Sequence, residues 1–266
     1  MTCMTELINE VSGQNVLKGR LYKLKYNITK QKFKEYDKTY LLYSIPNVIG
    51  AITQEKEYII DKLSDSLKLF LNGANKVLVV GLGNRHIRSD SFGTECINKV
   101  IATRNLINSK REVSVISPSV FGLTGIESAD IIKSVCDVVK PDAVLIIDTL
   151  CANDYNNLIT NIQISDDGFR PGAGVGNMRK HINNNTLNIK TISIGVPLVV
   201  YAKTLVDNAI GENQNIKIKD KLFEGLVVTT KDIDVVINKL SYIISASINL
   251  ALNDYSLAEQ NIILDN

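Results

Sequence analysis

Two aspartates stand where they could act together as an acid–base pair. Asp90 follows the turn Gly81-Leu82-Gly83, which comes directly after an apolar run, and Asp148 lies near the end of the most apolar run, DAVLIIDTL. We expect both at the carboxyl ends of parallel strands, the sheet edge where open α/β folds bind ligands. Two neighbouring carboxyls cannot both ionise cheaply, so one keeps its proton at neutral pH. Such a pair can activate water and protonate a leaving amine, which is peptide hydrolysis without a metal.

Each aspartate also has a structural interpretation. Asp90 could cap the helix that follows it, a common role for aspartate in that position. Asp148 could be a buried carboxylate, satisfied by hydrogen bonds, that ties down a loop, because an unpaired carboxylate among aliphatic residues is costly. The shared strand edge favours the functional pair over two independent structural roles.

The glycine-rich segments do not fit nucleotide-binding motifs. The third glycine of a dinucleotide fingerprint would fall at position 86, which is His86, and no acidic residue ends the second strand. The stretch SDDGFRPGAGVGNMRK lacks the Gly-Lys-Ser/Thr of a phosphate-binding loop. A long glycine-rich loop can offer backbone N–H groups to a substrate strand, or simply connect two elements. Thr124 and Glu127 have the spacing of a capping box, at a helix that also begins at the presumed active edge.

The sequence supports a metal site or a cysteine or serine nucleophile less than it supports the aspartate pair. His86 and His181, the two histidines, lack further ligands at the close spacing of a zinc site. Cys151 could pair with His86 as a nucleophile, but it follows a core strand, which predicts a buried and inert thiol. No serine stands in a Gly-x-Ser-x-Gly motif. We expect neither a metal nor a cofactor.

The elements that must position these residues alternate between strands and helices. Apolar strands are predicted at 39–46, 76–80, 112–117, 142–150 and 191–197, and a half-exposed strand or hairpin at 161–168. Helices are predicted at 54–71, from about Cys96 to Ile101, at 125–139 and at 231–253. This order predicts an α/β fold with a mainly parallel sheet and helices on both faces. We expect one domain over residues 1–266, with 1–37 as a variable N-terminal extension.

The composition excludes some classes of partner. The net charge of +2 is too small for a nucleic-acid-binding surface, and the lysines from Lys18 to Lys38 alternate with Tyr, Leu and Glu as on a solvated face. The start MTCMTELINE lacks the features of a signal peptide. No apolar run approaches the about 18 residues that span a bilayer. We therefore expect a cytoplasmic protein, with its four cysteines reduced, that contacts neither nucleic acid nor membrane.

Several segments together resemble the spore germination protease family. TNIQISDDGFRPGAGVGNMRK, followed by TISIGVPLVV, is similar almost residue for residue to that family's most distinctive stretch. GLTGIESADIIKSVCDVVKPDAVLIIDTL resembles its segment from a helix into the Asp-bearing strand, and VVGLGN with Asp90 and Gly93 resembles its glycine turn. The likeness covers roughly residues 38–254.

The resemblance implies an atypical aspartic-type endopeptidase that degrades small acid-soluble, DNA-coating spore proteins during germination, in the cytoplasm of the spore core. It implies a fold similar to that of the hydrogenase maturation peptidases. The family's two important aspartates correspond to Asp90 and Asp148. The substrate-binding positions that we expect are Gly83, Asn84, Glu127, Gly172, Gly174, Gly176 and Asn177.

The chain departs from the family's pattern at four places. Arg88-Ser89 stands for Thr-Pro, Thr94 for Pro, and Asn153 for an expected Arg. The acidic segment that the family removes on maturation has no clear counterpart in residues 1–10, and several dozen residues are missing around 216–226. These departures motivate a second hypothesis, a catalytically silent paralogue that binds spore proteins or regulates the protease. A third is a metal-dependent peptidase in which carboxylates and His86 hold the ion. Homo-oligomerisation is left open.

Overall fold

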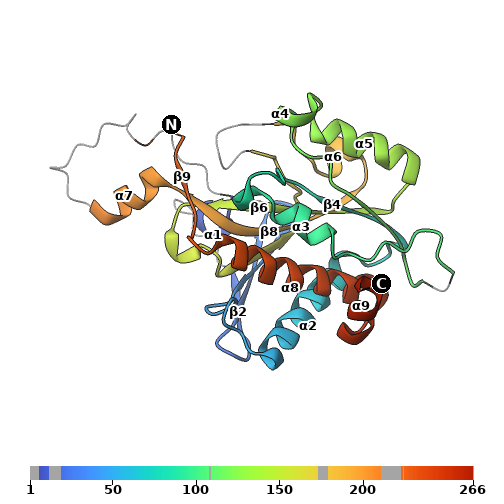
Figure 1. Ribbon diagram of the computed structural model, residues 1–266, viewed down its shortest axis with the longest axis horizontal. Coiled ribbons are helices and arrows are strands. Elements are labelled where there is room, and N and C mark those ends of the chain that lie inside the picture. The colour runs from blue at the N-terminus through green and yellow to red at the C-terminus, as the bar shows by residue number, and fades with distance from the viewer. Residues whose placement is uncertain are drawn as a thin grey trace.

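A single β-sheet forms the centre of the fold. The computed structural model describes residues 6–11, 19–107, 109–172, 179–210, 223 and 225–265. The strands are β1 (Arg20–Lys23), β2 (Thr29–Glu35), β3 (Lys38–Ser44), β4 (Lys76–Gly81), β5 (Glu112–Ile116), β6 (Ala143–Ala152), β7 (Asn161–Ser165), β8 (Lys190–Tyr201) and β9 (Val227–Val228). Within the described residues they make one nine-stranded sheet in the order β1-β2-β3-β7-β8-β6-β4-β5, with β9 paired to β8 (Figure 1).

The parallel half of the sheet consists of β5, β4, β6 and β8. Its central strands are continuous apolar runs, and β4 from Val77 and β6 as far as Ile147 are buried residue after residue. Strands of this kind are buried on both faces, as in sheets that carry helices on each side. The predicted α/β class is confirmed.

The other half of the sheet is antiparallel, so the sheet as a whole is mixed rather than mainly parallel. Residues 20–35, where the sequence shows only weak strand signals, join it as β1 and β2. All five residues of β7 are buried, so the expectation of a half-exposed strand was wrong. Its polar side chains have partners: Gln163 accepts a hydrogen bond from the Ile8 N–H at 2.8 Å, and the Ser165 and Ser193 hydroxyls lie 2.7 Å apart.

Helices cover both faces of the sheet, as predicted. The helices and 3-10 turns are α1 (Ile8–Val11), α2 (Thr53–Phe70), η1 (Arg88–Asp90), α3 (Phe92–Ile97), α4 (Phe121–Thr124), α5 (Ser128–Val139), η2 (Tyr155–Asn157), α6 (Asn184–Leu187), α7 (Ala202–Ile210), α8 (Ile233–Asn253) and α9 (Leu257–Leu264). Alternate residues of β4 point to opposite sides, so that Val79 belongs to the apolar cluster that includes α2, α3 and α8, and Val80 to the cluster that includes α1, α5 and α6. Figure 1 shows the two helical layers above and below the sheet.

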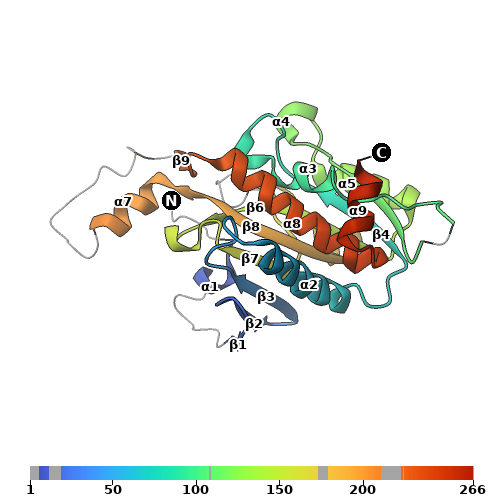
Figure 2. The ribbon, with the colours of Figure 1, turned by 60° about the horizontal axis from the view of Figure 1, so that its bottom comes forward.

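The α8 helix is the longest of the described helices, and it lies beside α2 on the same face of the sheet (Figure 2). By length and composition it could cross a membrane, contrary to the sequence expectation, but 72% of its most apolar stretch is buried inside the protein. Burial of that extent is typical of a core helix. The helix α3 ends at Ile97, earlier than predicted, and the Ile101 N–H is satisfied instead by the Asn249 side chain of α8 at 2.9 Å.

Candidate active site

An open cavity of about 470 Å³ lies at the carboxyl ends of β4 and β6. The described site residues that the sequence predicts all line it: Gly83, Asn84, Asp90, Glu127, Asp148 and Gly172. Gly174, Gly176 and Asn177 lie outside the described residues. The structure therefore brings Asp90 and Asp148, 58 positions apart in the printed sequence, to the same cavity.

The η1 turn places Asp90 against the loop that leaves β4. Its Oδ2 accepts a hydrogen bond from the Asn84 N–H at 2.8 Å. The N-cap position of α3 is Ser91, and no side chain caps that helix, so the interpretation of Asp90 as a helix cap was wrong. Asp90 instead closes the turn after β4 and presents its carboxyl group to the cavity.

Two glycines allow the backbones around Asp90 to approach closely. Gly83 has a φ of +107°, and a Cβ there would lie 1.9 Å from the Asp90 carbonyl oxygen. A Cβ on Gly93, at the start of α3, would lie 2.4 Å from the carbonyl oxygens of both Ile147 and Leu82. Because real Cβ atoms do not approach backbone this closely, any other residue would separate the turn and α3 from the ends of β4 and β6.

Asp148 sits within β6, where the register pairs it with Gly195 of β8. Among the hydrogen bonds of the described residues, its carboxyl group accepts one, from the N–H of the next residue, Thr149, at 2.8 Å. That bond is local to the strand, so Asp148 does not tie down a loop. Burial, followed by the negative charges of Asp90 and Glu6, raises the pKa of Asp148 well above its ordinary value.

The two carboxyl groups differ in how strongly they hold a proton. Burial also raises the pKa of Asp90, but the Asn84 N–H stabilises its ionised form and opposes that rise. Asp148 also accepts one backbone N–H bond, but there the negative charges of Asp90 and Glu6 add to the effect of burial. The pair is therefore asymmetric, with Asp148 holding a proton more strongly than Asp90 does.

The cavity's rim includes an ion pair that the sequence did not predict. The Glu127 carboxylate lies 3.5 Å from Nη1 of Arg179, whose guanidinium stacks over the Phe121 ring at 4.6 Å. The predicted capping box is wrong: Glu127 occupies the N-cap position of α5 and its side chain caps nothing. The Thr124 hydroxyl instead accepts from the Ile126 N–H at 3.1 Å, because α4 ends there in a left-handed Gly125.

Glu6 is a fourth carboxylate at the cavity, beside Asp90, Asp148 and Glu127, and sequence reasoning missed it. Its Oε2 accepts from the Cys151 N–H at 2.9 Å, and its own N–H donates to the Cys151 carbonyl at 3.3 Å. The N-terminal segment thus lies along β6 just past Asp148. No local signal marks Glu6, because a glutamate in a polar segment is ordinary and its place depends on β6, far along the chain.

The cysteine and histidine side chains add no support for a Cys151–His86 nucleophile or for a metal site. Cys151 is buried, as expected of an inert thiol, although it lines the cavity. His86 is exposed and points to Arg85, whose Nε lies 3.4 Å from the His86 Nε2. Over the described part of the chain, no three His, Cys, Asp or Glu side chains gather closely enough to hold a metal ion.

The raised pKa of Asp148 predicts a pH-dependent stability. A carboxyl whose folded-state pKa is raised supports folding most at pH below its ordinary value of 3.8, and that support is lost as pH rises through the raised pKa. Asp148→Asn should therefore raise the Tm at about pH 7, and the gain should shrink towards about pH 4. Calorimetry over this range, with the exposed Asp61→Asn as the matched control, measures it. A gain independent of pH would contradict the assignment.

The fold and the cavity define a class of protein: an α/β protein with two carboxyl groups of unequal proton affinity at one edge of its sheet. The family model described as germination protease matches residues 9–214. The germination protease of Clostridium tetani is 37% identical over 251 residues, which cover 80% of this chain and 78% of the relative. That of Caldanaerobacter subterraneus is 40% identical over 212 residues, which cover 66% of this chain and 65% of the relative. The chain belongs to the germination protease family, a family of peptidases.

A solved structure also resembles the chain. The [NiFe] hydrogenase maturation protease of Thermococcus kodakarensis is 14% identical, and the match covers 69% of this chain and 98% of that one, with a TM-score of 0.39.

Proposed function

We propose that the protein is an aspartic-type endopeptidase that hydrolyses small acid-soluble spore proteins, with Asp90 and Asp148 as its acid–base pair. The observation that supports this most is the asymmetry of the two carboxyl groups within one cavity. The Asn84 N–H stabilises Asp90 as a carboxylate, whereas burial and the charges of Asp90 and Glu6 raise the pKa of Asp148. A base and an acid side by side are what metal-free amide hydrolysis needs.

In this mechanism, the ionised Asp90 accepts a proton from a water molecule while the water oxygen attacks the scissile carbonyl carbon. Asp148 then donates its proton to the amide nitrogen as the carbon–nitrogen bond breaks. One product carries the new carboxyl group and the other carries the new amine. Transfer of the proton from Asp90 to Asp148, directly or through water, restores the starting state.

The substrate would lie along the cavity as an extended chain. Gly172 lines the cavity, as Arg179 and Glu127 do, and its lack of a side chain leaves space for a peptide backbone. The neighbouring Glu127–Arg179 pair offers both charges at the rim. We propose that the enzyme and its substrate proteins share one compartment, the cytoplasm of the spore core.

Incubation of the purified full chain with a purified small acid-soluble spore protein tests the proposal. We expect discrete fragments by mass spectrometry that also form in the presence of a chelator. Binding of the intact substrate without fragments would favour the catalytically silent paralogue, and loss of cleavage on chelation would favour a metal-dependent peptidase. Either outcome overturns the proposed mechanism.

A further inference from the structure

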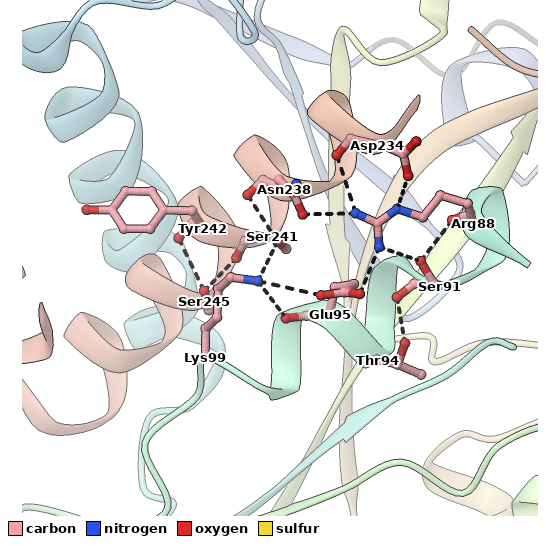
Figure 3. Close-up of polar contacts among 10 residues, drawn as sticks. All are labelled: Arg88, Ser91, Thr94, Glu95, Lys99, Asp234, Asn238, Ser241, Tyr242 and Ser245. Carbon is pink, nitrogen blue, oxygen red and sulfur yellow. Dashed lines mark hydrogen bonds and ion pairs between the residues drawn. The ribbon is translucent and has the colours of Figure 1, made fainter. Parts of the chain in front are cut away.

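Arg88 ties the η1 turn to the helices α3 and α8 (Figure 3). Its Nε lies 2.6 Å from Oδ1 of Asp234, at the start of α8. Its Nη2 donates to the Asn238 side chain at 2.9 Å, and its Nη1 contacts the Glu95 carboxylate of α3 at 2.8 Å. One guanidinium therefore bridges η1, α3 and α8.

The residues that follow Arg88 are anchored on the cavity side. The Ser89 carbonyl accepts a hydrogen bond from the Thr149 hydroxyl of β6 at 3.3 Å, and Asp90 accepts from Asn84. Three consecutive residues are thus held by three different parts of the fold. Arg88 does not line the cavity, whereas Ser89 and Asp90 do.

A three-residue turn depends on such anchors. Within the turn, the Asp90 N–H donates to the Ile87 carbonyl at 2.9 Å, and the Ser91 N–H donates to the Arg88 carbonyl at 3.1 Å. A planar guanidinium presents its donors in a fixed fork, so several simultaneous contacts define both position and orientation. The Arg88 side chain is only 30% exposed, which reduces the screening of its ion pairs by solvent.

We propose that Arg88 is a positioning residue, which sets the place of Asp90 beside Asp148 by fixing η1 against α3 and α8. The expected effect of Arg88 on catalysis rests on the proposed function, whereas its effect on the position of Asp90 does not.

The matched control is Lys99, which belongs to the same polar network (Figure 3). Its ammonium group donates to the Glu95 carbonyl at 3.2 Å and to the Ser241 hydroxyl of α8 at 3.1 Å. Lys99 thus also joins α3 to α8 and lies 3.8 Å from the Glu95 carboxylate that Arg88 contacts, but within the described structure it makes no direct contact with η1. Arg88→Met and Lys99→Met each remove one cation from this interface, and only the first releases the turn.

Misplacement of a catalytic group by about 1 Å can cost about a hundredfold in rate. We therefore expect Arg88→Met to lower kcat on the spore-protein substrate roughly ten- to a hundredfold, with KM changed less than about twofold. Lys99→Met should keep kcat within about twofold of the wild type.

The variant Arg88→Lys keeps one charged arm, so its kcat should fall between those of Arg88→Met and Lys99→Met. It replaces Arg88→Met if that variant does not fold. Equal losses of kcat in the Lys99 and Arg88 variants would mean that both act only through stability, and would overturn the inference.

Carboxyl titration by carbon-13 NMR tests the geometry without any activity. Two negative charges raise the pKa of Asp148: that of Asp90, which belongs to η1, and that of Glu6, which belongs to the N-terminal segment. Release of η1 should weaken only the contribution of Asp90, so the Asp148 midpoint should fall in Arg88→Met and stay unchanged in Lys99→Met. An unchanged Asp148 titration in Arg88→Met would overturn the inference, even if the protein cleaved no spore protein. A changed titration with no cleavage by the wild type would sink the proposed function and leave the positioning role standing.

Discussion

Asp148→Asn is expected to lower kcat on a small acid-soluble spore protein by about 100- to 10,000-fold, the usual contribution of general acid–base catalysis. The asparagine side chain has nearly the same shape but cannot pass a proton to the leaving amine. The fold should survive, because the hydrogen bond that Asp148 accepts from the Thr149 N–H can be accepted equally by the amide oxygen. Steady-state kinetics with circular dichroism as the folding check measures the effect, and Asp61→Asn on the exposed side of α2 serves as the control.

The companion variant Asp90→Asn should cause a similar loss for the opposite reason, because it removes the base. In the wild type, activity should fall at low pH as Asp90 becomes protonated and at high pH as Asp148 loses its proton, which gives a bell-shaped profile. The macroscopic limits belong to the pair rather than to either residue. An Asp148→Asn protein that cleaves at the wild-type rate would rule out the acid–base pair.

Gly93→Ala is expected to destabilise the fold by about 2 kcal/mol or more, towards the upper end of the cost of overpacking. A Cβ at this position would meet the Leu82 and Ile147 carbonyl oxygens at 2.4 Å and the Leu82 nitrogen at 2.7 Å. These are backbone atoms at the ends of β4 and β6, so the clash cannot be relieved by a side-chain rotation. We expect α3 to move outward and carry η1 and Asp90 with it.

Urea unfolding measures this effect, with Gly122→Ala as the matched control. A Cβ at Gly122 would have no neighbour within 4 Å, so its stability should change by less than about 0.5 kcal/mol. A Gly93→Ala protein as stable as the control would show that α3 does not need its close approach to the sheet.

The parallel half of the fold was predictable because its information is local. The runs at β4 and β6 are apolar without alternation, which only a strand buried on both faces explains. The antiparallel half was not, because lysines on β2 hide its strand pattern, and because β7, the partner of β3, lies far along the chain. The capping box failed because a left-handed Gly125 ends α4 before Glu127, a turn that the spacing of Thr124 and Glu127 does not reveal.

The same distinction separates the parts of the candidate site. Asp90 and Asp148 could be proposed from the sequence because strand ends in an α/β sheet share an edge. Glu6, Arg179 and Arg88 could not, since each acquires its role from a partner on a distant element: β6 for Glu6, α5 for Arg179, and α8 for Arg88.

The pairing of β3 with β7 has a consequence for the order in which the protein can assemble during its synthesis. Tyr40 pairs with Ser165 and Ser44 with Asn161, so the inner edge of the β1–β2–β3 meander lacks its partner until β7 leaves the ribosome. The helix α2 and the strands β4, β5 and β6 are made in that interval. We expect the meander to dock late, because long-range strand pairing requires a large loop to close first. Until then the edge of β3 is a surface on which a nascent chain can associate with its neighbours.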